Sequence, residues 1–264
     1  MPATVPLYAR QVGQGPEDIV ILHGVFGSGD NWGTFIKPWA TQYKVHLVDL
    51  RNHGRSPHAI PISYELMAAD VAQYITANCK ASCHIIGHSM GGKTAMYLAW
   101  KFPQLVKSLA VIDIAPRQYP AHHQLYIQGM RSVDPPSLNS RAEAETRMAE
   151  FVKEPGVRQF LLKNLGRSEA VLFEWKHNLE GIAANIDEVG VELPQEAKIT
   201  CPLLFVRGTQ SGYIQSEDEV EIKSRFPQAQ IVAIDNAGHW IQVENPNDRM
   251  LELNRFLVAT YMFT

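Results

Sequence analysis

The sequence contains no stretch that could cross a membrane and no excess charge of either sign. Its apolar runs fall short of the ~18 consecutive residues that a membrane-spanning helix requires, and Met1 to Gly15 lack the basic start and apolar stretch of a signal peptide. We therefore expect neither a membrane span nor a secretory leader. The 24 Lys and Arg residues nearly balance the 27 Asp and Glu residues, giving a net charge of −3. This balance predicts neither nucleic acid nor an anionic membrane surface as a partner.

Cysteine is scarce, since the chain has only Cys79, Cys83 and Cys201. An odd number without the spacing of a metal site favours free thiols over a disulfide framework, although Cys79 and Cys83 flank a helix-to-strand junction and could be neighbours. With the missing leader, this predicts a reduced, cytoplasmic setting. The chain also has no His-Glu-x-x-His motif and no Cys-x-x-Cys pair, so we predict no metal and no cofactor.

What is present is material for a globular core. Hydrophobic residues make up 45% of the chain and charged residues 19%, which is typical of a globular protein. Residues 19 to 114 alternate between apolar runs of strand type and segments with helical periodicity. Strands are expected at 19–22, 44–49, 83–86 and 108–114, and helices near 32–41, 63–75 and 92–102. This alternation predicts an α/β fold with a mostly parallel sheet and helices on both faces.

The segment from 115 to 196 has a different character. It begins with several prolines, has no strand-like run, and contains aromatic side chains that could pack against one another. We predict a helical cap insertion with helices near 121–132, 140–153, 156–164 and 169–186. The strand pattern resumes at 202–206 and 231–234, with helices at 216–225 and 246–261. The expected domains are a core of residues 1–114 and 197–264 and a cap of residues 115–196.

The motif Gly87-His88-Ser89-Met90-Gly91 lies between a predicted strand and a predicted helix. The two glycines remove the Cβ atoms that would collide in so tight a turn, so the Ser89 hydroxyl is exposed at its tip. The following helix directs its free N–H groups toward this position, where they favour negative charge. The motif in this setting predicts Ser89 as a nucleophile.

Residues 87–94 also match the phosphate-loop pattern Gly-x4-Gly-Lys-Thr. Such a loop normally follows the first strand of its domain and needs a partner aspartate on another strand to hold Mg²⁺. Here the match lies on the third predicted strand and shares its residues with the serine turn. Nucleotide binding is therefore the weaker of the two interpretations.

A serine hydroxyl needs a base within hydrogen-bond reach before it can act as a nucleophile near neutral pH. Of the ten histidines, His239 is the best placed, because it follows the predicted strand 231–234. It should therefore lie at the carboxyl edge of the sheet, where Ser89 also lies. The alternative is an ordinary surface-loop histidine. We predict His239 as the general base.

An acidic residue must orient this histidine and stabilise its positive charge. Its usual position is the loop after the strand that corresponds to 202–206, but residues 208–212 contain no carboxylate. Asp113 ends the strand that follows the Ser89 helix, and an unpaired carboxylate would be costly to bury there. We predict Asp113 as the acid, with Ser211 bonded to the Asp–His pair. Ordinary turn chemistry remains the alternative for Ser211.

The tetrahedral intermediate of acyl transfer needs two backbone donors, which form an oxyanion hole. One should be the N–H of Met90, directly after the nucleophile, and the other should come from the loop 23–27. We predict Val25 as the second donor, with Phe26 as the alternative. The side chains of Phe26 and Trp240 are expected to line the substrate pocket. His23 and His88 flank the site as structural residues.

With these residues assembled, the chain resembles the α/β-hydrolase superfamily over nearly its whole length, and more narrowly the bacterial YbfF-type esterases. The motifs that carry the resemblance are His-Gly at 23–24, Asp-Leu-Arg-Asn-His-Gly-Arg-Ser at 49–56, the serine motif extended to 87–92, Val-Ile-Asp-Ile-Ala-Pro at 111–116 and Gly-His at 238–239. The resemblance implies hydrolysis of short acyl esters, and of acyl thioesters, with Ser89, Asp113 and His239 as triad. It also implies that Ser211 stands where most members of the superfamily carry the acid.

The sequence thus predicts a serine hydrolase that cleaves short-to-medium acyl esters through an acyl-enzyme, with the cap selecting the substrate. A different reaction on the same scaffold, such as carbon–carbon bond hydrolysis or elimination, is the main alternative. A ligand-binding receptor that keeps the fold is another alternative, and a missing triad residue would favour it. The fold serves too many chemistries to identify the substrate.

Overall fold

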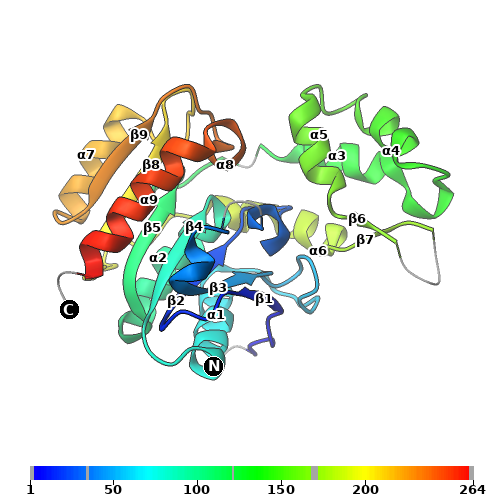
Figure 1. The fold of residues 1–264 in the computed structure, drawn as a ribbon. Helices are drawn as coiled ribbons and strands as arrows, with labels where there is room; N and C mark the ends of the chain where they lie inside the picture. Colours follow the sequence, from blue (N-terminus) through cyan, green and yellow to red (C-terminus); the bar gives the residue numbers. More distant parts are fainter. Residues whose placement is uncertain (1–2, 34–35, 121, 168–171, 262–264) are drawn as a thin grey trace.

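The computed structural model describes residues 3–33, 36–120, 122–167 and 172–261. A seven-stranded sheet with the order β1-β3-β2-β4-β5-β8-β9 forms the centre of the molecule (Figure 1). Only β1 is antiparallel to its neighbour, and the other strand pairs are parallel. The strands are β1 (Ala9–Val12), β2 (Glu17–Leu22), β3 (Tyr43–Val48), β4 (Cys83–His88), β5 (Val106–Ile112), β8 (Leu203–Gly208) and β9 (Gln230–Ile234). The predicted α/β fold is confirmed.

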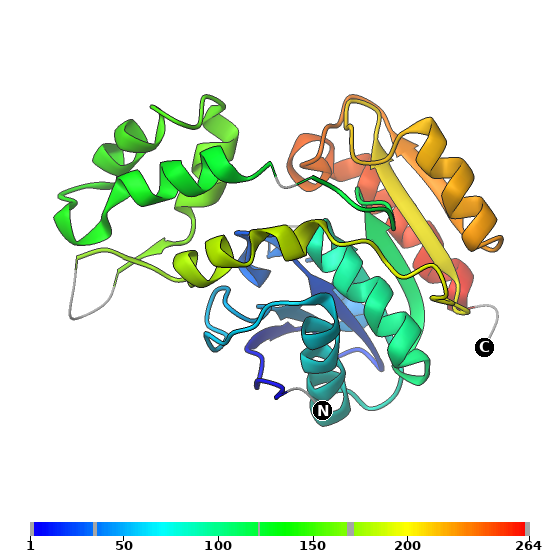
Figure 2. The same ribbon diagram turned by 180° about the vertical axis from the view of Figure 1, so that it is seen from behind.

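Helices cover both faces of this sheet (Figures 1 and 2). On one face lie α1 (Tyr64–Asn78), α2 (Met90–Lys101) and α7 (Ser216–Arg225), and α9 (Pro246–Tyr261) lies on the other. Strand β2 shows why both faces need a cover: Val20 and Leu22 belong to one apolar cluster and Ile19 and Ile21 to the other. Successive side chains of a strand point to opposite faces, so a strand with apolar residues throughout must be buried on both sides.

Local sequence signals account for the start of α1. The Ser63 hydroxyl accepts a hydrogen bond from the Leu66 N–H (3.3 Å) and caps the helix. Met67, Val71 and Tyr74 are buried on one side of α1. Helix α2 is buried along almost its whole length, because it lies against α1 and the strands β4 and β5.

The chain between β5 and β8 forms the helical region at the upper right of Figure 1. Its helices are α3 (Gln124–Val133), α4 (Arg141–Met148), α5 (Pro155–Leu162) and α6 (Leu179–Ala184). Contrary to the prediction, this region also contains a short antiparallel pair, β6 (Leu165–Gly166) with β7 (Glu174–Trp175). The helix expected near 169–186 is shorter than predicted: only α6 is α-helical, 172–178 are not helical, and 168–171 lie outside the described residues.

The helix expected at 32–41 is also wrong. The chain instead makes two 3₁₀ turns, Gly29–Trp32 and Trp39–Thr41. Pro38 explains part of the difference, because a proline in the middle of a helix removes a hydrogen bond and clashes with the preceding turn. Trp32 and Trp39 are nonetheless buried, in the apolar cluster beneath α9. Among the described residues, no helix is both long and apolar enough to cross a bilayer.

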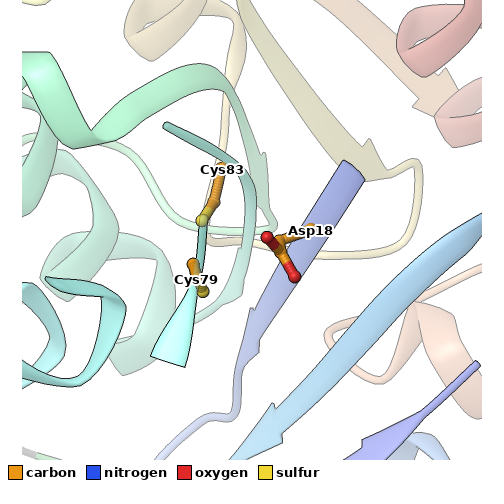
Figure 3. A group of neighbouring side chains, drawn as sticks. All are labelled: Asp18, Cys79 and Cys83. Atoms are coloured by element: carbon orange, nitrogen blue, oxygen red, sulfur yellow. The ribbon is translucent and has the colours of Figure 1, made fainter. Parts of the chain in front are cut away.

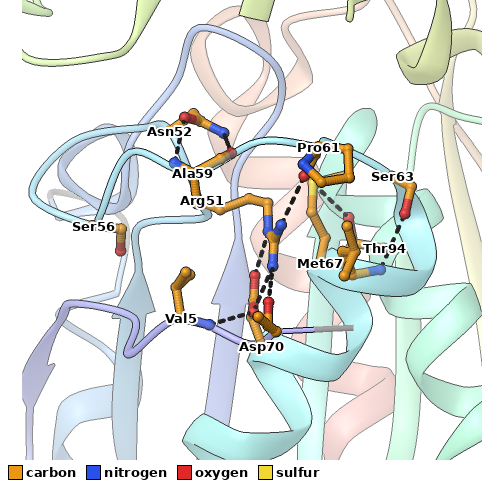
Figure 4. A network of polar contacts seen from close by, with 12 residues as sticks. Val5, Arg51, Asn52, Ser56, Ala59, Pro61, Ser63, Met67, Asp70 and Thr94 are labelled. Carbon is orange, nitrogen blue, oxygen red and sulfur yellow. Dashed lines mark hydrogen bonds and ion pairs between the residues drawn. The ribbon is translucent and has the colours of Figure 1, made fainter. Parts of the chain in front are cut away.

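A buried ion pair fixes the loop that follows β3 (Figure 4). Arg51 donates to both carboxylate oxygens of Asp70 on α1, at 2.6 and 2.8 Å, and to the carbonyl of Pro61 at 2.8 Å. The Val5 N–H donates to the same carboxylate at 2.8 Å. Both charged side chains are almost fully buried, so loss of either partner would leave an uncompensated charge in the core. This pair holds the loop in position beside the functional site.

Candidate active site

Ser89 lies on a strained turn between β4 and α2. Its backbone has φ 53° and ψ −120°, a region that a non-glycine residue adopts rarely and usually at functional sites. A Cβ on Gly87 would lie 2.3 Å from the Gly91 carbonyl oxygen, and one on Gly91 would lie 2.4 Å from that of Leu22. Only glycine fits at these two positions, which is why the motif can form this turn.

The imidazole of His239 bridges Ser89 and Asp113. Its Nε2 lies 3.1 Å from Ser89 Oγ, and its Nδ1 lies 2.8 Å from Asp113 Oδ2. The three residues follow three different strands, β4, β5 and β9, whose carboxyl ends meet at one edge of the parallel sheet. With Nδ1–H donating to the carboxylate, Nε2 is free to accept the serine proton. The structure thus brings together the three residues that the sequence predicts as a triad.

The carboxylate of Asp113 is fully buried and accepts three hydrogen bonds. Besides His239, Ser211 Oγ donates to Oδ2 at 2.5 Å and the Gly208 N–H donates to Oδ1 at 3.1 Å. These donors compensate the charge that burial would otherwise penalise. Ser211 is therefore hydrogen-bonded to the Asp–His pair, as expected from the sequence. Asp218 in turn binds Arg117 (2.6 Å) and caps α7 through the Gln215 N–H, so it plays no part in this group.

His88 supports the loop that carries His239. Its Nε2–H donates to the main-chain oxygen of His239 at 2.9 Å. Burial, together with the neighbouring imidazole of His239, holds the pKa of His88 well below its usual value. The ring is therefore neutral and acts as a structural donor, as the sequence predicts.

The backbone N–H groups predicted for an oxyanion hole are those of Met90 and of the loop 23–27. Met90 is the first residue of α2, so its N–H has no acceptor within the helix. In the loop after β2, the Phe26 N–H donates to His53 Nε2 at 3.2 Å, which excludes Phe26 as the free donor. The Val25 N–H has no hydrogen-bond acceptor among the described residues. Val25 therefore remains the better candidate of the two.

Two histidines fix the shape of this loop. His53 Nδ1–H donates to the Arg51 carbonyl at 2.9 Å, which leaves Nε2 as the acceptor for Phe26. His23 accepts the Leu50 N–H at Nε2 (3.0 Å). Burial lowers the pKa of His53 to about 3 and that of His23 to about 4. Both rings are neutral near pH 7, which their role as acceptors requires.

The cap also touches this loop. Asn164, which follows α5, donates from Nδ2 to the Phe26 carbonyl at 2.6 Å. Phe26 itself has a positive φ of 57°, and this conformation is held from one side by His53 and from the other by Asn164. The cap thus helps to set the backbone geometry of the loop that follows β2.

A cavity of about 210 Å³ opens onto Ser89 and His239. Its walls are largely apolar, and α5 of the cap contributes Val157, Phe160 and Leu161. Trp240 lines it from the core side and packs against Phe160, with ring centroids 4.2 Å apart. Phe26 also lines the cavity, so both side chains predicted for the substrate pocket are found there.

Several residues of the site were not predicted. His53 lies within a motif that carried the family resemblance, but nothing in the sequence connects it with Phe26. Tyr213, Asn164 and Phe160 lie in loops or on cap helices, and their signals are ordinary polar or aromatic residues. Only the fold shows that Tyr213 and Phe160 line the cavity and that Asn164 bonds the Phe26 carbonyl.

The phosphate-loop interpretation does not fit the structure. The ammonium group of Lys93 is buried and donates to the main-chain oxygens of Arg117 (2.7 Å), Gly190 (3.1 Å) and Val191. A phosphate-binding lysine must instead be free to reach its ligand. Lys93 is therefore occupied as a structural donor between the core and the two ends of the cap.

Comparison with known proteins agrees with the fold. Residues 19–246 match the family described as the alpha/beta hydrolase fold. The sn-1-specific diacylglycerol lipase ABHD11 of Mus musculus is 39% identical over 251 residues, which cover 90% of this chain and 80% of that protein. Esterase YbfF of Escherichia coli is 32% identical, over 90% of this chain and 92% of that protein.

A solved structure described as a marine microorganism esterase is similar along the whole fold. It superimposes with a TM-score of 0.92 at 38% sequence identity, covering 96% of this chain and 100% of that chain. These matches confirm the resemblance found in the sequence motifs. The chain belongs to the α/β-hydrolase family.

Proposed function

We propose that this chain is a serine esterase that hydrolyses short-to-medium acyl esters through an acyl-enzyme intermediate. The observation that carries the proposal is the continuous hydrogen-bonded series from Ser89 through His239 to Asp113, which opens into an apolar cavity. The relatives named as esterases and as a lipase support the same reaction class. Acyl thioesters present the same carbonyl group and form a second substrate class to test.

In the acylation step, Ser89 Oγ attacks the ester carbonyl while His239 Nε2 takes the hydroxyl proton. The oxygen of the tetrahedral intermediate becomes an anion, and the N–H groups of Val25 and Met90 would stabilise it. Each such donor is worth about 3 kcal/mol of transition-state stabilisation in comparable enzymes. His239 then returns the proton to the leaving alcohol, and the acyl group stays on Ser89.

Deacylation repeats this sequence with water in place of serine. His239 removes a proton from water, the hydroxide attacks the acyl carbonyl, and the acid leaves as Ser89 regains its proton. Asp113 holds the Nδ1–H tautomer of His239 throughout and stabilises the imidazolium that forms twice in each cycle. Ser211 and Gly208 keep the Asp113 carboxylate in place through their hydrogen bonds.

The shape of the cavity limits the substrate. Its volume of about 210 Å³ and its apolar wall suit an acyl chain of modest length more than a large polar group. Phe26 and Trp240 would contact the acyl chain from the core side, and α5 would contact it from the cap.

We place the domain boundaries at 1–114 with 197–264 for the core and 115–196 for the cap. The three free thiols support a reduced, cytoplasmic setting.

The test is hydrolysis of p-nitrophenyl esters of increasing acyl length by the wild type, Ser89→Ala and Asp113→Asn. We expect turnover by the wild type, a loss of about 10⁶ in kcat for Ser89→Ala, and a loss of about 10⁴ for Asp113→Asn. Trapping the acyl-enzyme by mass spectrometry should locate the acyl group on Ser89. Full activity in Asp113→Asn would remove this residue from the triad. No turnover by the wild type would favour carbon–carbon bond hydrolysis, elimination or a binding role instead.

A further inference from the structure

Four side chains that can bind a metal ion gather far from the active site, at the opposite edge of the sheet. Asp18 and Cys83 lie at the start of the parallel strands β2 and β4, whereas Ser89 follows the end of β4. Cys79 is the residue after α1, and His46, on β3, contacts both Asp18 and Cys79. Figure 3 shows the carboxylate and the two thiols side by side at this edge.

The donor atoms of Asp18, Cys79 and Cys83 lie near enough to one another to share one metal ion. One donor atom from each of Asp18, Cys79 and Cys83 lies within 4.8 Å of the others. His46 Nε2 adds a fourth donor, 2.9 Å from Asp18 Oδ1 and 3.8 Å from Cys79 Sγ. With Zn–S bonds of about 2.3 Å and Zn–N bonds of about 2.0 Å, tetrahedral geometry requires a sulfur-to-nitrogen distance of about 3.5 Å. The distance between His46 Nε2 and Cys79 Sγ is close to this value.

Further hydrogen bonds orient two of these donors, His46 and Asp18. The hydroxyl of Tyr74 lies 2.8 Å from His46 Nδ1, so the second ring nitrogen is engaged and Nε2 faces the cluster. The Lys80 N–H donates to the outer carboxylate oxygen of Asp18 at 3.3 Å. Oxygen partners of this kind orient histidine and carboxylate ligands in known metal sites. The four donors come from four different elements of the fold. A buried Asp–His pair beside two thiols does not by itself require such an arrangement.

We propose that Asp18, His46, Cys79 and Cys83 bind one zinc ion. Two thiolates, an imidazole and a carboxylate favour Zn²⁺ over Mg²⁺ or Ca²⁺, and the three residues between the cysteines fall within the spacing common in zinc sites. No metal was expected from the sequence, because it has neither a His-Glu-x-x-His motif nor a Cys-x-x-Cys pair. On binding, Zn–S bonds replace the S–H bonds of both thiols, whose protons pass to the solvent, while the carboxylate of Asp18 and the lone pair on Nε2 of neutral His46 coordinate the ion.

The site would tie together elements that meet only in the folded protein. Zinc would link β2, β3 and β4 with the end of α1, so it would bind the native state more tightly than the unfolded chain. The ion can reach the site past Cys79, which is partly exposed, whereas Asp18 and Cys83 are buried. The role we infer is structural and independent of ester hydrolysis, because the site lies at the edge of the sheet opposite to Ser89.

Cobalt(II) provides a direct probe, since it occupies zinc sites and reports its ligands by absorbance. The full chain, kept reduced with a phosphine and freed of metal by a chelator, should take up one equivalent of Co²⁺. We expect a thiolate-to-cobalt charge-transfer band in the near ultraviolet and strong visible bands of four-coordinate cobalt. Addition of one equivalent of Zn²⁺ should abolish them and raise the Tm of the wild type.

Variants separate this site from adventitious binding. Cys79→Ser, Cys83→Ser and His46→Gln should each lose the charge-transfer band or weaken it severely, and Zn²⁺ should no longer raise their Tm. Cys201→Ser is the matched control, since it removes a thiol outside the cluster and should keep the full signal. Circular dichroism checks that each variant folds. Cys79 is partly exposed, so Cys79→Ser remains informative if the buried variants do not fold.

Three results would overturn the proposal. The first is a reduced wild type that takes up no cobalt. The second is a charge-transfer band that survives in the Cys79→Ser/Cys83→Ser double variant. The third is a Cys79–Cys83 disulfide that persists in the presence of reductant and blocks uptake, which would identify the pair as redox-active cysteines and not as metal ligands.

Discussion

The imidazole of His239 lies flat against the phenol ring of Tyr213, with ring centroids 3.8 Å apart and planes inclined by 17°. The same tyrosine donates its main-chain N–H to Ser211 Oγ at 3.2 Å, and Ser211 in turn donates to Asp113. Its hydroxyl is hydrogen-bonded to His122 at 2.6 Å. The loop that carries Ser211 and Tyr213 therefore contacts both the acid and the base of the proposed triad.

We predict that Tyr213→Ala lowers kcat for a p-nitrophenyl ester by about ten-fold, because removal of the ring lets His239 leave its productive orientation. Tyr213→Phe keeps the stacked ring and loses only the hydroxyl contact, so it should retain most of the activity. Steady-state kinetics on both variants measure the difference. Equal losses in the two variants would assign the effect to the hydroxyl and contradict a role for stacking.

We predict that His53→Ala lowers kcat/KM by about ten- to a hundred-fold. The Phe26 N–H loses its acceptor, and the loop that carries the proposed donor Val25 relaxes. His58→Ala is the control, since His58 is an exposed histidine of the same loop. Because an uncompensated buried donor also costs stability, urea unfolding should accompany the kinetics. An unchanged kcat/KM in folded His53→Ala would show that the loop keeps its shape without this histidine.

We predict that acid destabilises the fold well before carboxylates are protonated. Burial lowers the pKa of His23 to about 4 and that of His53 and His177 to about 3. Between about pH 6.5 and pH 4 the unfolded chain therefore binds more protons than the native state, so the free energy of unfolding falls as pH falls. The slope is up to about 1.4 kcal/mol per pH unit for each such histidine. Urea unfolding at pH 7.5, 6 and 5 measures it.

His177 offers the sharpest check of this effect. Neither of its ring nitrogens has a hydrogen-bond partner among the described residues, and the ring packs near Phe26 and Trp175. His177→Phe should fill the same space without a group that protonates, so its free energy of unfolding should depend less steeply on pH than that of the wild type. An unchanged slope would mean that His177 is protonated to the same extent in the native and unfolded states.

We predict that Lys93→Met destabilises the protein by about 2–4 kcal/mol. The Lys93 ammonium joins the carbonyl of Arg117, where the chain enters the cap, to those of Gly190 and Val191, where it returns. Methionine would leave these buried oxygens without a donor. Lys101→Met is the control, because Lys101 is an exposed lysine on the same helix. Urea unfolding compares the two, and equal stability would contradict a fastening role for Lys93.

Much of the architecture could be predicted from short stretches of sequence. The apolar runs at 19–22 and 83–86 lie within β2 and β4, and the last helix has the predicted bounds, Pro246–Tyr261. The Ser89 turn could be predicted as well, because its glycines are required by contacts within the turn and with the adjacent strand end. Such features depend on local periodicity and backbone sterics, which a sequence displays directly.

Part of the candidate site could also be predicted from local sequence patterns. Ser89, Asp113 and His239 each end or follow a predicted strand, and parallel strands bring their carboxyl ends to one edge. Whether their atoms come within hydrogen-bond distance could not be read from this pattern. The tertiary structure decides that Asp113 accepts from both His239 and Ser211.

Other features arise only from packing between distant segments. Asn164 reaches Phe26 across 138 positions of sequence, and Lys93 reaches Val191 across 98. Asp18 and Cys79 are likewise far apart in the chain but neighbours at the edge of the sheet. The sequence by itself determined the strands, the serine turn and the family, because these are encoded by neighbouring residues. The tertiary structure alone decided how the cap, the loop of Phe26 and the cysteine cluster are assembled, because those contacts depend on how whole elements pack.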